Sequence, residues 1–534
     1  MLKDLFQNTS ILTHLIWRRD RVRIPVWIIS IAIITFIVAL AYPSLFKSEV
    51  ERQLMAETMK NPAMIAMVGP GYGLDNYHTG AIMAHEMLLF TAITVAIMNI
   101  MLTIRHTRHD EENGRIEMIR SLPVGKLANS ASTLLVLTAA NVCLGLIVGL
   151  GLSALGIESM DLPGSLLYGA VLTVTGILFA AVTTLFAQLT ETSRATTGYS
   201  FAFLGFAYLV RAIGDVSSET LALLSPLGLI LRTQVYVNNY WWPIIITLLA
   251  AVVVTIIALW LNTIRDLEAG FISAKPGRKY ASPLLLSPFG LMLRLEKTTL
   301  IGWAVGVFIL GISYGSIFGD IDHFFQTSDL YQLLLPTIEG FSLTDQFVAM
   351  LLSIMAMISA IPALLVVLKL RSEEKANRIE HLLARAVSRT KLMGSCIIIA
   401  VFTAVIMQVL SVLGLWIAAK AVMEHPFQLG PVMQGAMYYL PSIWILVGLA
   451  ALLTALTPKT TSLAWIYLGY TFFVVYLGGL LQLPEWMAKL TPFGYVPNVP
   501  MESWSTKAML FWTLIASAIM GLGLYNYHNR DSCL

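Results

Sequence analysis

The chain alternates long apolar runs with short polar segments. A largely apolar stretch of about 20 residues is long enough to cross a bilayer as a helix. The first half contains six such stretches, at residues 25–43, 83–104, 131–156, 164–188, 197–214 and 242–262. The second half contains six more, at residues 299–318, 346–370, 393–419, 433–456, 461–482 and 508–526. The pattern therefore predicts an all-α polytopic membrane protein with about twelve transmembrane helices.

One polar signature occurs twice along this pattern. Residues 110–120 read DEENGRIEMIR and residues 373–383 read EEKANRIEHLL, each directly after an apolar run. At a shift of about 263 residues the two copies share two glutamates, one arginine and one isoleucine, which indicates an internal repeat. Because each half has an even number of predicted spans, we expect two parallel six-helix repeats related by an axis along the membrane normal.

The start of each half supports the same division. Residues 9–24 place apolar side chains on one side with a basic cluster after them, which is typical of an amphipathic helix in the membrane interface. Residues 291–303 repeat this pattern. We predict a first half at residues 1–262, a cytoplasmic linker at residues 263–290 and a second half at residues 291–534.

Composition excludes a water-soluble protein. Of the 534 residues, 57% are hydrophobic and 12% are charged, whereas soluble domains carry about 25% charged residues. Lys and Arg are concentrated at residues 105–130, 263–298 and 371–392, and are absent from 157–163, 319–345 and 421–432. Basic loops stay on the cytoplasmic side. We therefore expect cytoplasmic N and C termini, with contact to membrane lipid and no nucleic-acid partner.

The sequence lacks the common motifs of nucleotide-binding, zinc and hydrolase sites. It contains no G-x-x-x-x-G-K-[ST] phosphate loop, no H-E-x-x-H zinc helix and no G-x-S-x-G nucleophile elbow. Its three cysteines form no spaced set. The first apolar run is too long for the core of a signal peptide, so we expect it to remain as a span. We expect no catalytic residue, no metal site and no cofactor in this chain.

The repeated polar stretch predicts a short cytoplasmic helix in each half, at about residues 108–122 and 372–385. Glu111 and Glu112 precede Arg115 by four and three residues, the favoured order for ion pairs on a helix. Ile116 and Ile119 recur at helical spacing. The plain interpretation is a solvated loop helix that closes a hairpin. Duplication, together with apolar residues that have no core nearby, instead favours a surface that fits a partner's groove.

A family resemblance rests on these features. The order of amphipathic helix, span, outer segment, span, E-E-x-G-R-x-E and L-P-V-G-K resembles the permeases of ABC-2 type (type V) exporters, over essentially the whole chain. The double-length form most resembles the polyketide-antibiotic (tetronasin-type) exporter permeases. The resemblance implies elbow helices at residues 9–24 and 284–298 and coupling helices at the two repeated stretches. The implied partner-binding residues are Glu111, Glu112, Arg115, Ile116, Glu117, Glu373, Glu374, Arg378, Ile379 and Glu380.

The resemblance also implies partners and a location. A separate ATP-binding subunit, in two copies that hold ATP and Mg²⁺, would dock from the cytoplasm of a bacterial cell. The permease would then export an amphipathic small molecule, such as an antibiotic, by alternating access. The second copy departs from the pattern because Asn377 replaces Gly114 and Ala386 replaces Pro123. The two halves therefore need not couple equally.

Polar residues inside spans are costly and are candidates for a transport path. The strongest are Glu86, Asn99 and Arg211. Alternatively, Glu86 and Arg211 extend to the interface, and Asn99 links helices by hydrogen bonds. Two other functions stay open, an ion-coupled secondary multidrug transporter that uses Glu86 or Arg211, and a toxin-sensing or immunity protein with the same ATPase partner. The sequence lacks the long chains of intramembrane acids expected of proton coupling, which favours the ATP-driven exporter.

Overall fold

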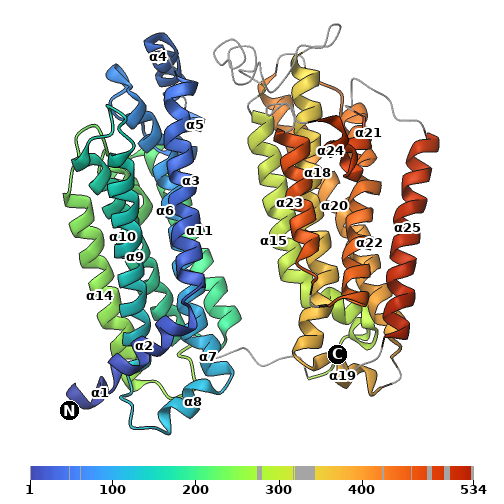
Figure 1. The fold of residues 1–534 in the computed structure, drawn as a ribbon, viewed down its shortest axis with the longest axis horizontal. Coiled ribbons are helices and arrows are strands. Elements are labelled where there is room, and N and C mark those ends of the chain that lie inside the picture. The colour runs from blue at the N-terminus through green and yellow to red at the C-terminus, as the bar shows by residue number, and fades with distance from the viewer. Residues whose placement is uncertain are drawn as a thin grey trace. The chain divides into compact units, whose positions relative to one another are not determined.

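The computed structural model describes residues 2–46, 48–60, 62–272, 279–316, 318, 343–385, 387–423, 426–458, 460–477, 484–497 and 506–530. These residues are mostly helical and contain eleven helices long and apolar enough to cross a membrane. The chain divides into two compact units, Met1–Gly277 and Arg278–Leu534, which we call unit 1 and unit 2 (Figure 1). The predicted all-α polytopic fold is confirmed.

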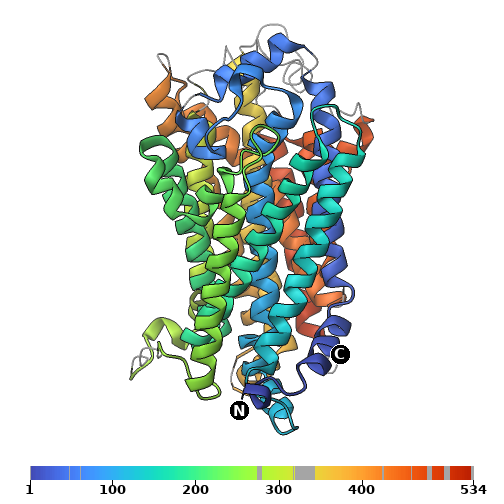
Figure 2. The same ribbon diagram turned by 90° about the vertical axis from the view of Figure 1, so that its left-hand side faces the viewer.

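Unit 1 contains six long helices that lie close to the predicted spans. They are α3 (Arg23–Leu45), α6 (Thr79–His106), α9 (Ala128–Ala154), α10 (Leu162–Leu189), α11 (Ser193–Ser217) and α14 (Trp242–Ile264). The shorter helices are α1 (Leu2–Leu5), α2 (Thr9–Arg19), α4 (Glu49–Thr58), α5 (Pro62–Val68), α7 (Arg108–Glu112), α8 (Arg115–Arg120), α12 (Glu219–Leu224) and α13 (Pro226–Leu231). Helices α2, α7 and α8 lie at one end of unit 1, with the N terminus, and α4 and α5 lie at the other (Figures 1 and 2).

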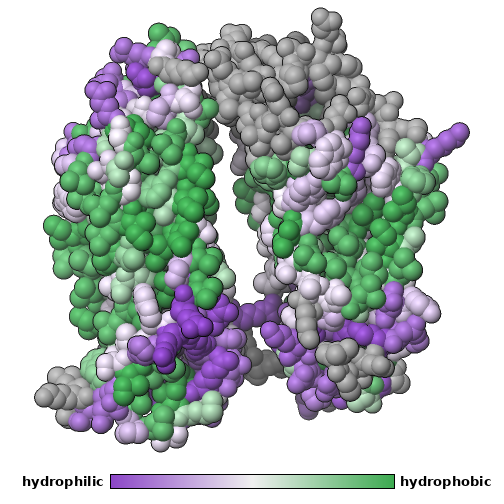
Figure 3. Space-filling model, in the orientation of Figure 1, coloured by the Kyte–Doolittle hydropathy of each residue, from purple (hydrophilic) through white to green (hydrophobic). Residues whose placement is uncertain are grey.

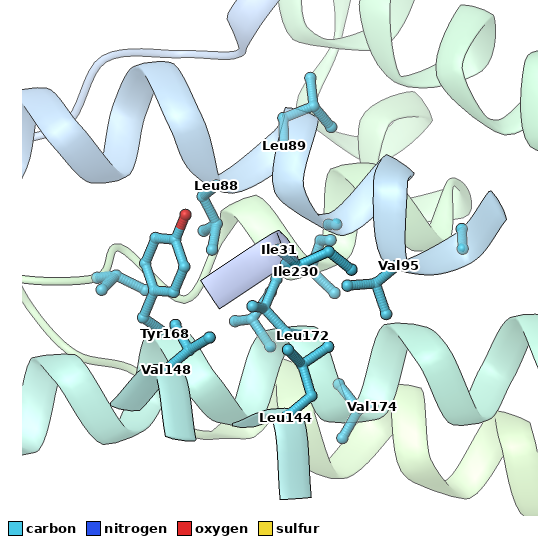
Figure 4. Close-up of a cluster of buried hydrophobic side chains, with 14 of the residues drawn as sticks. Ile31, Leu88, Leu89, Val95, Leu144, Val148, Tyr168, Leu172, Val174 and Ile230 are labelled. Carbon is cyan, nitrogen blue, oxygen red and sulfur yellow. The ribbon is translucent and has the colours of Figure 1, made fainter. Parts of the chain in front are cut away.

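Helix α10 is the centre of unit 1 and packs against α9, α6 and α14. Its approach to α9 depends on a pair of glycines: a Cβ atom on Gly145 would lie 2.5 Å from the carbonyl oxygen of Gly169. Small residues allow such close contact between helices in a membrane, where packing rather than expulsion of water holds them together. Figure 4 shows the resulting core, in which Leu144 of α9, Leu172 of α10 and Leu88 of α6 meet.

The outer face of unit 1 is apolar where it would meet lipid. Leu249, Val253 and Trp260 of α14 are more than half exposed. A space-filling view of unit 1 shows a hydrophobic band between two hydrophilic ends (Figure 3). This distribution fits a chain whose middle contacts lipid tails and whose ends contact water.

Unit 2 repeats the arrangement in its own helices. Its long helices are α15 (Pro288–Ser316), α18 (Leu343–Lys375), α20 (Arg389–Val422), α21 (Leu429–Tyr438), α22 (Leu440–Leu456), α23 (Leu463–Leu477) and α25 (Thr506–Asn529), and its short ones are α19 (Arg378–Leu383) and α24 (Glu485–Lys489). Helices α21 and α22 together form one predicted span, and their junction coincides with Pro441, near the start of α22. The end of the predicted span 461–482 lies outside the described residues.

One predicted boundary is corrected. The elbow helix expected at residues 284–298 is not separate, because α15 runs unbroken from a 3-10 turn at Pro283–Leu286 into the span. In unit 1, by contrast, a turn separates α2 from α3. Pro25 lies at the start of α3, where its missing N–H and its ring oppose a continuous helix. The corresponding residue of α15 is Ile301, which has a backbone N–H and allows the helix to continue.

The linker predicted at residues 263–290 stays a prediction. Its first part is fastened to unit 1, since the backbone N–H of Ile272 donates to Leu189 at 2.7 Å. Residues 273–278 lie outside the described residues.

Candidate functional site

The two repeated stretches share one backbone turn. In unit 1, Gly114 has φ 68° between α7 and α8, and in unit 2, Asn377 has φ 56° between α18 and α19. This left-handed conformation suits glycine, and asparagine adopts it more readily than most other residues. The replacement of Gly114 by Asn377 therefore preserves the turn.

After the turn, each short helix presents one acid and buries one isoleucine. Ile116 and Ile379 are 5% and 4% exposed and anchor α8 and α19 to their units. The next residues, Glu117 and Glu380, are exposed, and within the described part of the chain neither makes an ion pair or a side-chain hydrogen bond. Met118 of α8 is also largely exposed.

Three of the acids before the turn point inward, which corrects part of the expected acidic surface, whereas Glu112 is exposed. Asp110, Glu111 and Glu373 are buried. Arg115 Nη1 lies 2.8 Å from Asp110 Oδ1, and Arg378 Nε lies 3.2 Å from Glu373 Oε2. The expected helical pair between Glu111 or Glu112 and Arg115 does not form in this part of the structure, because the turn at Gly114 interrupts the helix that would align them.

A second repeated pair ties the turn to the last span of each unit. Glu111 accepts two hydrogen bonds of 2.9 Å from Arg265, which directly follows α14. Glu374 accepts one of 2.9 Å from Arg530, which directly follows α25. The backbone N–H of Glu268 also donates to Glu111, at 2.7 Å.

A third repeated pair involves the arginine three residues before each of these glutamates. Arg108 Nη1 lies 3.1 Å from Glu111, and Arg371 Nη1 lies 3.4 Å from Glu374. Both arginines also donate to a backbone carbonyl that follows the fourth span of their unit, Thr190 in unit 1 and Pro458 in unit 2.

The fourth repeated pair reaches the first amphipathic segment of each unit. Asp20, after α2, contacts His106 at the end of α6, and Glu296 in α15 lies 3.7 Å from Lys369 in α18. Burial by itself would raise the pKa of the Asp20 carboxyl, but its hydrogen bond with His106 and the nearby positive charges outweigh burial, so this pKa lies below its ordinary value.

Helix α2 is tied to the turn by a further contact. Arg19 donates to Asp110 at 2.8 Å through Nη2. The hydrogen bond to Asp110 raises the pKa of Arg19 above its ordinary value.

These four pairs form a network that occurs once in each unit, and we call it the turn network. It joins the first amphipathic segment, the second span and the end of the last span to α8 in unit 1 and to α19 in unit 2. Sequence reasoning singled out the network acids Glu111, Glu373 and Glu374 but missed their partners Arg265 and Arg530, and it missed the pairs of Asp20 with His106 and of Glu296 with Lys369. Each of these partners lies more than 70 positions from the acid that it binds, and the one available signal was an arginine placed directly after the last span of each half.

One position beside the turn network has opposite charge in the two units. Glu112 accepts a 2.7 Å hydrogen bond from the backbone N–H of Ser193, at the start of α11, where a negative charge is favourable. Its counterpart in unit 2 is Lys375, which is exposed. The two copies thus have the same turn with opposite charge beside it.

Of the candidate path residues, Asn99 links helices. Asn99 and Asn141 exchange two amide hydrogen bonds of 2.9 and 2.8 Å between α6 and α9. Both side chains are fully buried. This is the helix-linking alternative predicted from the sequence.

Arg211 is buried rather than extended to the interface. It is 0% exposed and donates to the carbonyls of Ala66 and Met67 near the end of α5, at 2.9 and 3.2 Å. It also lies 3.4 Å from Asp215. The unsatisfied carbonyls at a helix C-terminus attract a cation, so Arg211 holds α5 against α11.

Glu86 of α6 accepts a hydrogen bond from the Tyr42 hydroxyl of α3. Within the described residues, no hydrogen bond or ion pair joins Glu86, Asn99 and Arg211 to one another, so they form no continuous polar chain. The same residues contain no group of three or more His, Cys, Asp or Glu side chains placed to hold a metal ion.

Comparison with known proteins agrees with this fold. The family model described as the C-terminal domain of multidrug efflux system permease Rv1217c matches residues 12–261 and 285–528, in both halves of the chain. The multidrug efflux system permease protein Rv1217c of Mycobacterium tuberculosis (strain ATCC 25618 / H37Rv) is 33% identical over 531 residues, which cover 98% of this chain and 95% of that protein. The chain is a multi-pass membrane protein that belongs to the Rv1217c family of multidrug efflux system permeases.

Proposed function

We propose that this chain is the membrane-spanning permease of an ATP-driven exporter of the ABC-2 type, powered by a separate ATP-binding subunit. Its cargo is an amphipathic small molecule of the antibiotic or drug type. The name of the Mycobacterium tuberculosis relative supports drug efflux, and the resemblance to tetronasin-type permeases supports an amphipathic antibiotic.

One observation carries the proposal: each unit presents a short helix that is exposed on one side and fastened from behind by the turn network. On that exposed side, α8 offers Glu117 and Met118, and α19 offers Glu380. A protein that pushes α8 would move α2 and the ends of α6 and α14 together, because Asp110 binds Arg19 at the end of α2 and Glu111 binds Arg265 after α14. Such a connection suits the transfer of motion from a docked partner to the spans.

The ends of the chain support docking from the cytoplasm. In unit 1 the N terminus lies at the end that carries α8, and in unit 2 the C terminus lies at the end that carries α19 (Figure 1). The Lys- and Arg-rich segments occur at these ends, as the positive-inside rule expects of a cytoplasmic face. Two ATP-binding subunits, which hold ATP and Mg²⁺, would then dock on the permease from the cytoplasm of a bacterial cell.

The two docking surfaces need not respond equally. The charge beside the turn is negative at Glu112 and positive at Lys375. A single kind of ATP-binding subunit would therefore meet two different surfaces. Net transport still requires that cargo binds the inward-facing and outward-facing states with different affinity.

The test is co-expression with the ATP-binding protein encoded nearby, followed by ATPase measurement in lipid. Glu117→Ala with Glu380→Ala should reduce co-purification of the ATP-binding protein or abolish cargo-stimulated hydrolysis. The matched control is Glu49→Ala with Glu158→Ala, which removes two exposed acids from the opposite end of unit 1. If no ATP-binding protein co-purifies and transport continues without ATP, the proposal is wrong and secondary transport replaces it.

A further inference from the structure

A cleft of about 660 Å³ opens on unit 1 between α3, α6 and α11, at the end that carries α7 and α8. Sites for small molecules have volumes of about 300–1,000 Å³. In Figure 3, hydrophilic atoms gather near the lower ends of α2 and α3, directly below the hydrophobic band. The cleft therefore lies at a polar–apolar boundary of unit 1.

The lining of the cleft combines an apolar wall with cations. Trp27 follows Arg23 by four residues on α3, and Met101 precedes Arg105 by four residues on α6. Residues four apart lie on the same face of a helix. Each of these helices thus presents an arginine toward the end of the unit and an apolar side chain one turn deeper. Arg194 of α11 adds a third cation.

Positive charge exceeds negative charge around this cleft. Arg23 and Arg105 lie 3.4 and 3.3 Å from the same carboxylate, that of Asp20, which is fully buried. Among the described residues no carboxylate pairs with Arg194. The nearby Glu112 is already held by Ser193, at the start of α11. Arg23 and Arg105 therefore share one carboxylate beside open volume, and Arg194 adds a further positive charge there.

We propose that this cleft binds the anionic head group of an amphiphile whose apolar body lies against Trp27 and Met101. Guanidinium groups form strong, charge-assisted hydrogen bonds with carboxylate and phosphate. An anionic phospholipid and an anionic amphipathic cargo share this chemistry. As a statement about cargo the inference rests on the proposed function, whereas binding itself requires neither ATP nor a partner subunit.

The experiment measures saturable binding of radiolabelled dodecanoate to the full chain in phosphatidylcholine nanodiscs, without ATP and without an ATP-binding subunit. The test variant is Arg23→Gln with Arg194→Gln. The matched control is Arg18→Gln with Arg21→Gln, which removes the same charge from exposed residues beside the cleft that do not line it. Uncharged dodecanol and cationic dodecyltrimethylammonium are the comparison ligands.

We expect dodecanoate affinity to fall on the order of tenfold in the test variant and to change little in the control. Dodecanol and dodecyltrimethylammonium should show no such difference. Equal losses in the two variants, or none in either, would overturn the proposal. Because ATP is absent, a failure here is distinct from a failure of the ATP-driven mechanism.

Two further arms separate the sources of the amphiphile. If adding phosphatidylglycerol to the nanodisc displaces dodecanoate from the wild-type protein, and does not reduce dodecanoate uptake by nanodiscs without protein, the cleft accepts a lipid head group. If phosphatidylglycerol does not displace dodecanoate, the cleft selects a free amphiphile. In that case the test variant should raise the KM for export of an anionic cargo and leave a neutral cargo unchanged. Either result supports an anionic-head site, and competition by dodecanol alone contradicts it.

Discussion

Replacing Glu111 by alanine should release the segment that follows α14. Glu111 is 5% exposed and binds both Arg265 and the backbone of Glu268. The substitution leaves Arg108 and Arg265 buried without their carboxylate. We therefore expect the stretch from Arg265 to Ile272 to open from unit 1 far more often than in wild type.

The size of the effect follows from these contacts. Removing one partner of a buried ion pair costs about 3–5 kcal/mol. The lower end applies here, because Arg265 still donates to the carbonyl of Ala269 at 2.6 Å. A cost of about 3 kcal/mol corresponds to a roughly hundredfold rise in the equilibrium constant for local opening.

Hydrogen–deuterium exchange of peptides that cover Ile272 measures this opening. The Ile272 amide donates to Leu189 rather than to Glu111, so its exchange reports movement of the segment and not the lost side chain itself. Glu117→Ala is the matched control, since this exposed acid should contribute no more than about 0.5 kcal/mol. Equal exchange at Ile272 in the two variants would refute the reasoning that the turn network holds the end of α14.

Two other predictions concern the turn and its ion pairs. Gly114→Val should destabilise unit 1 by about 1–2 kcal/mol, because a valine would be strained at φ 68° although there is space for its side chain. Asn377→Gly should change thermal stability little, and equal shifts in melting temperature for the two variants would contradict this reasoning. For Asp20, whose pKa is lowered on folding, the stabilisation is complete above its ordinary pKa of about 3.9 and is lost as pH falls through the lower folded value. Asp20→Asn should therefore melt below wild type at pH 7, with the gap closing in acid; a gap that widens in acid would show that another group is responsible.

The structure shows where local sequence rules stop. Glu111 and Arg115 have the spacing and order of a stabilising helical pair, yet each binds a different partner. A left-handed residue at Gly114 ends the helix between them. Arg265 instead forms a buried ion pair with Glu111 through two hydrogen bonds. A buried ion pair is stable only when its geometry is good.

Polar residues within spans show the same limit. The sequence marks Asn99 and Arg211 as costly to bury, and both do have specific partners. Whether such a residue lines a path or joins helices depends on what lies opposite. Asn141 faces Asn99, and the end of α5 faces Arg211.

The sequence by itself determined the transmembrane helices and the repeat of the polar signature, because apolar length and a fixed shift are properties of consecutive residues. It also placed Glu117 and Glu380 on short helices at the membrane boundary. Only the tertiary structure decided which acids are exposed. Asp110 and Glu111 turn inward because cations distant in sequence, on α2 and after α14, meet them there. Such contacts depend on how the helices pack, and no local pattern of residues encodes that packing.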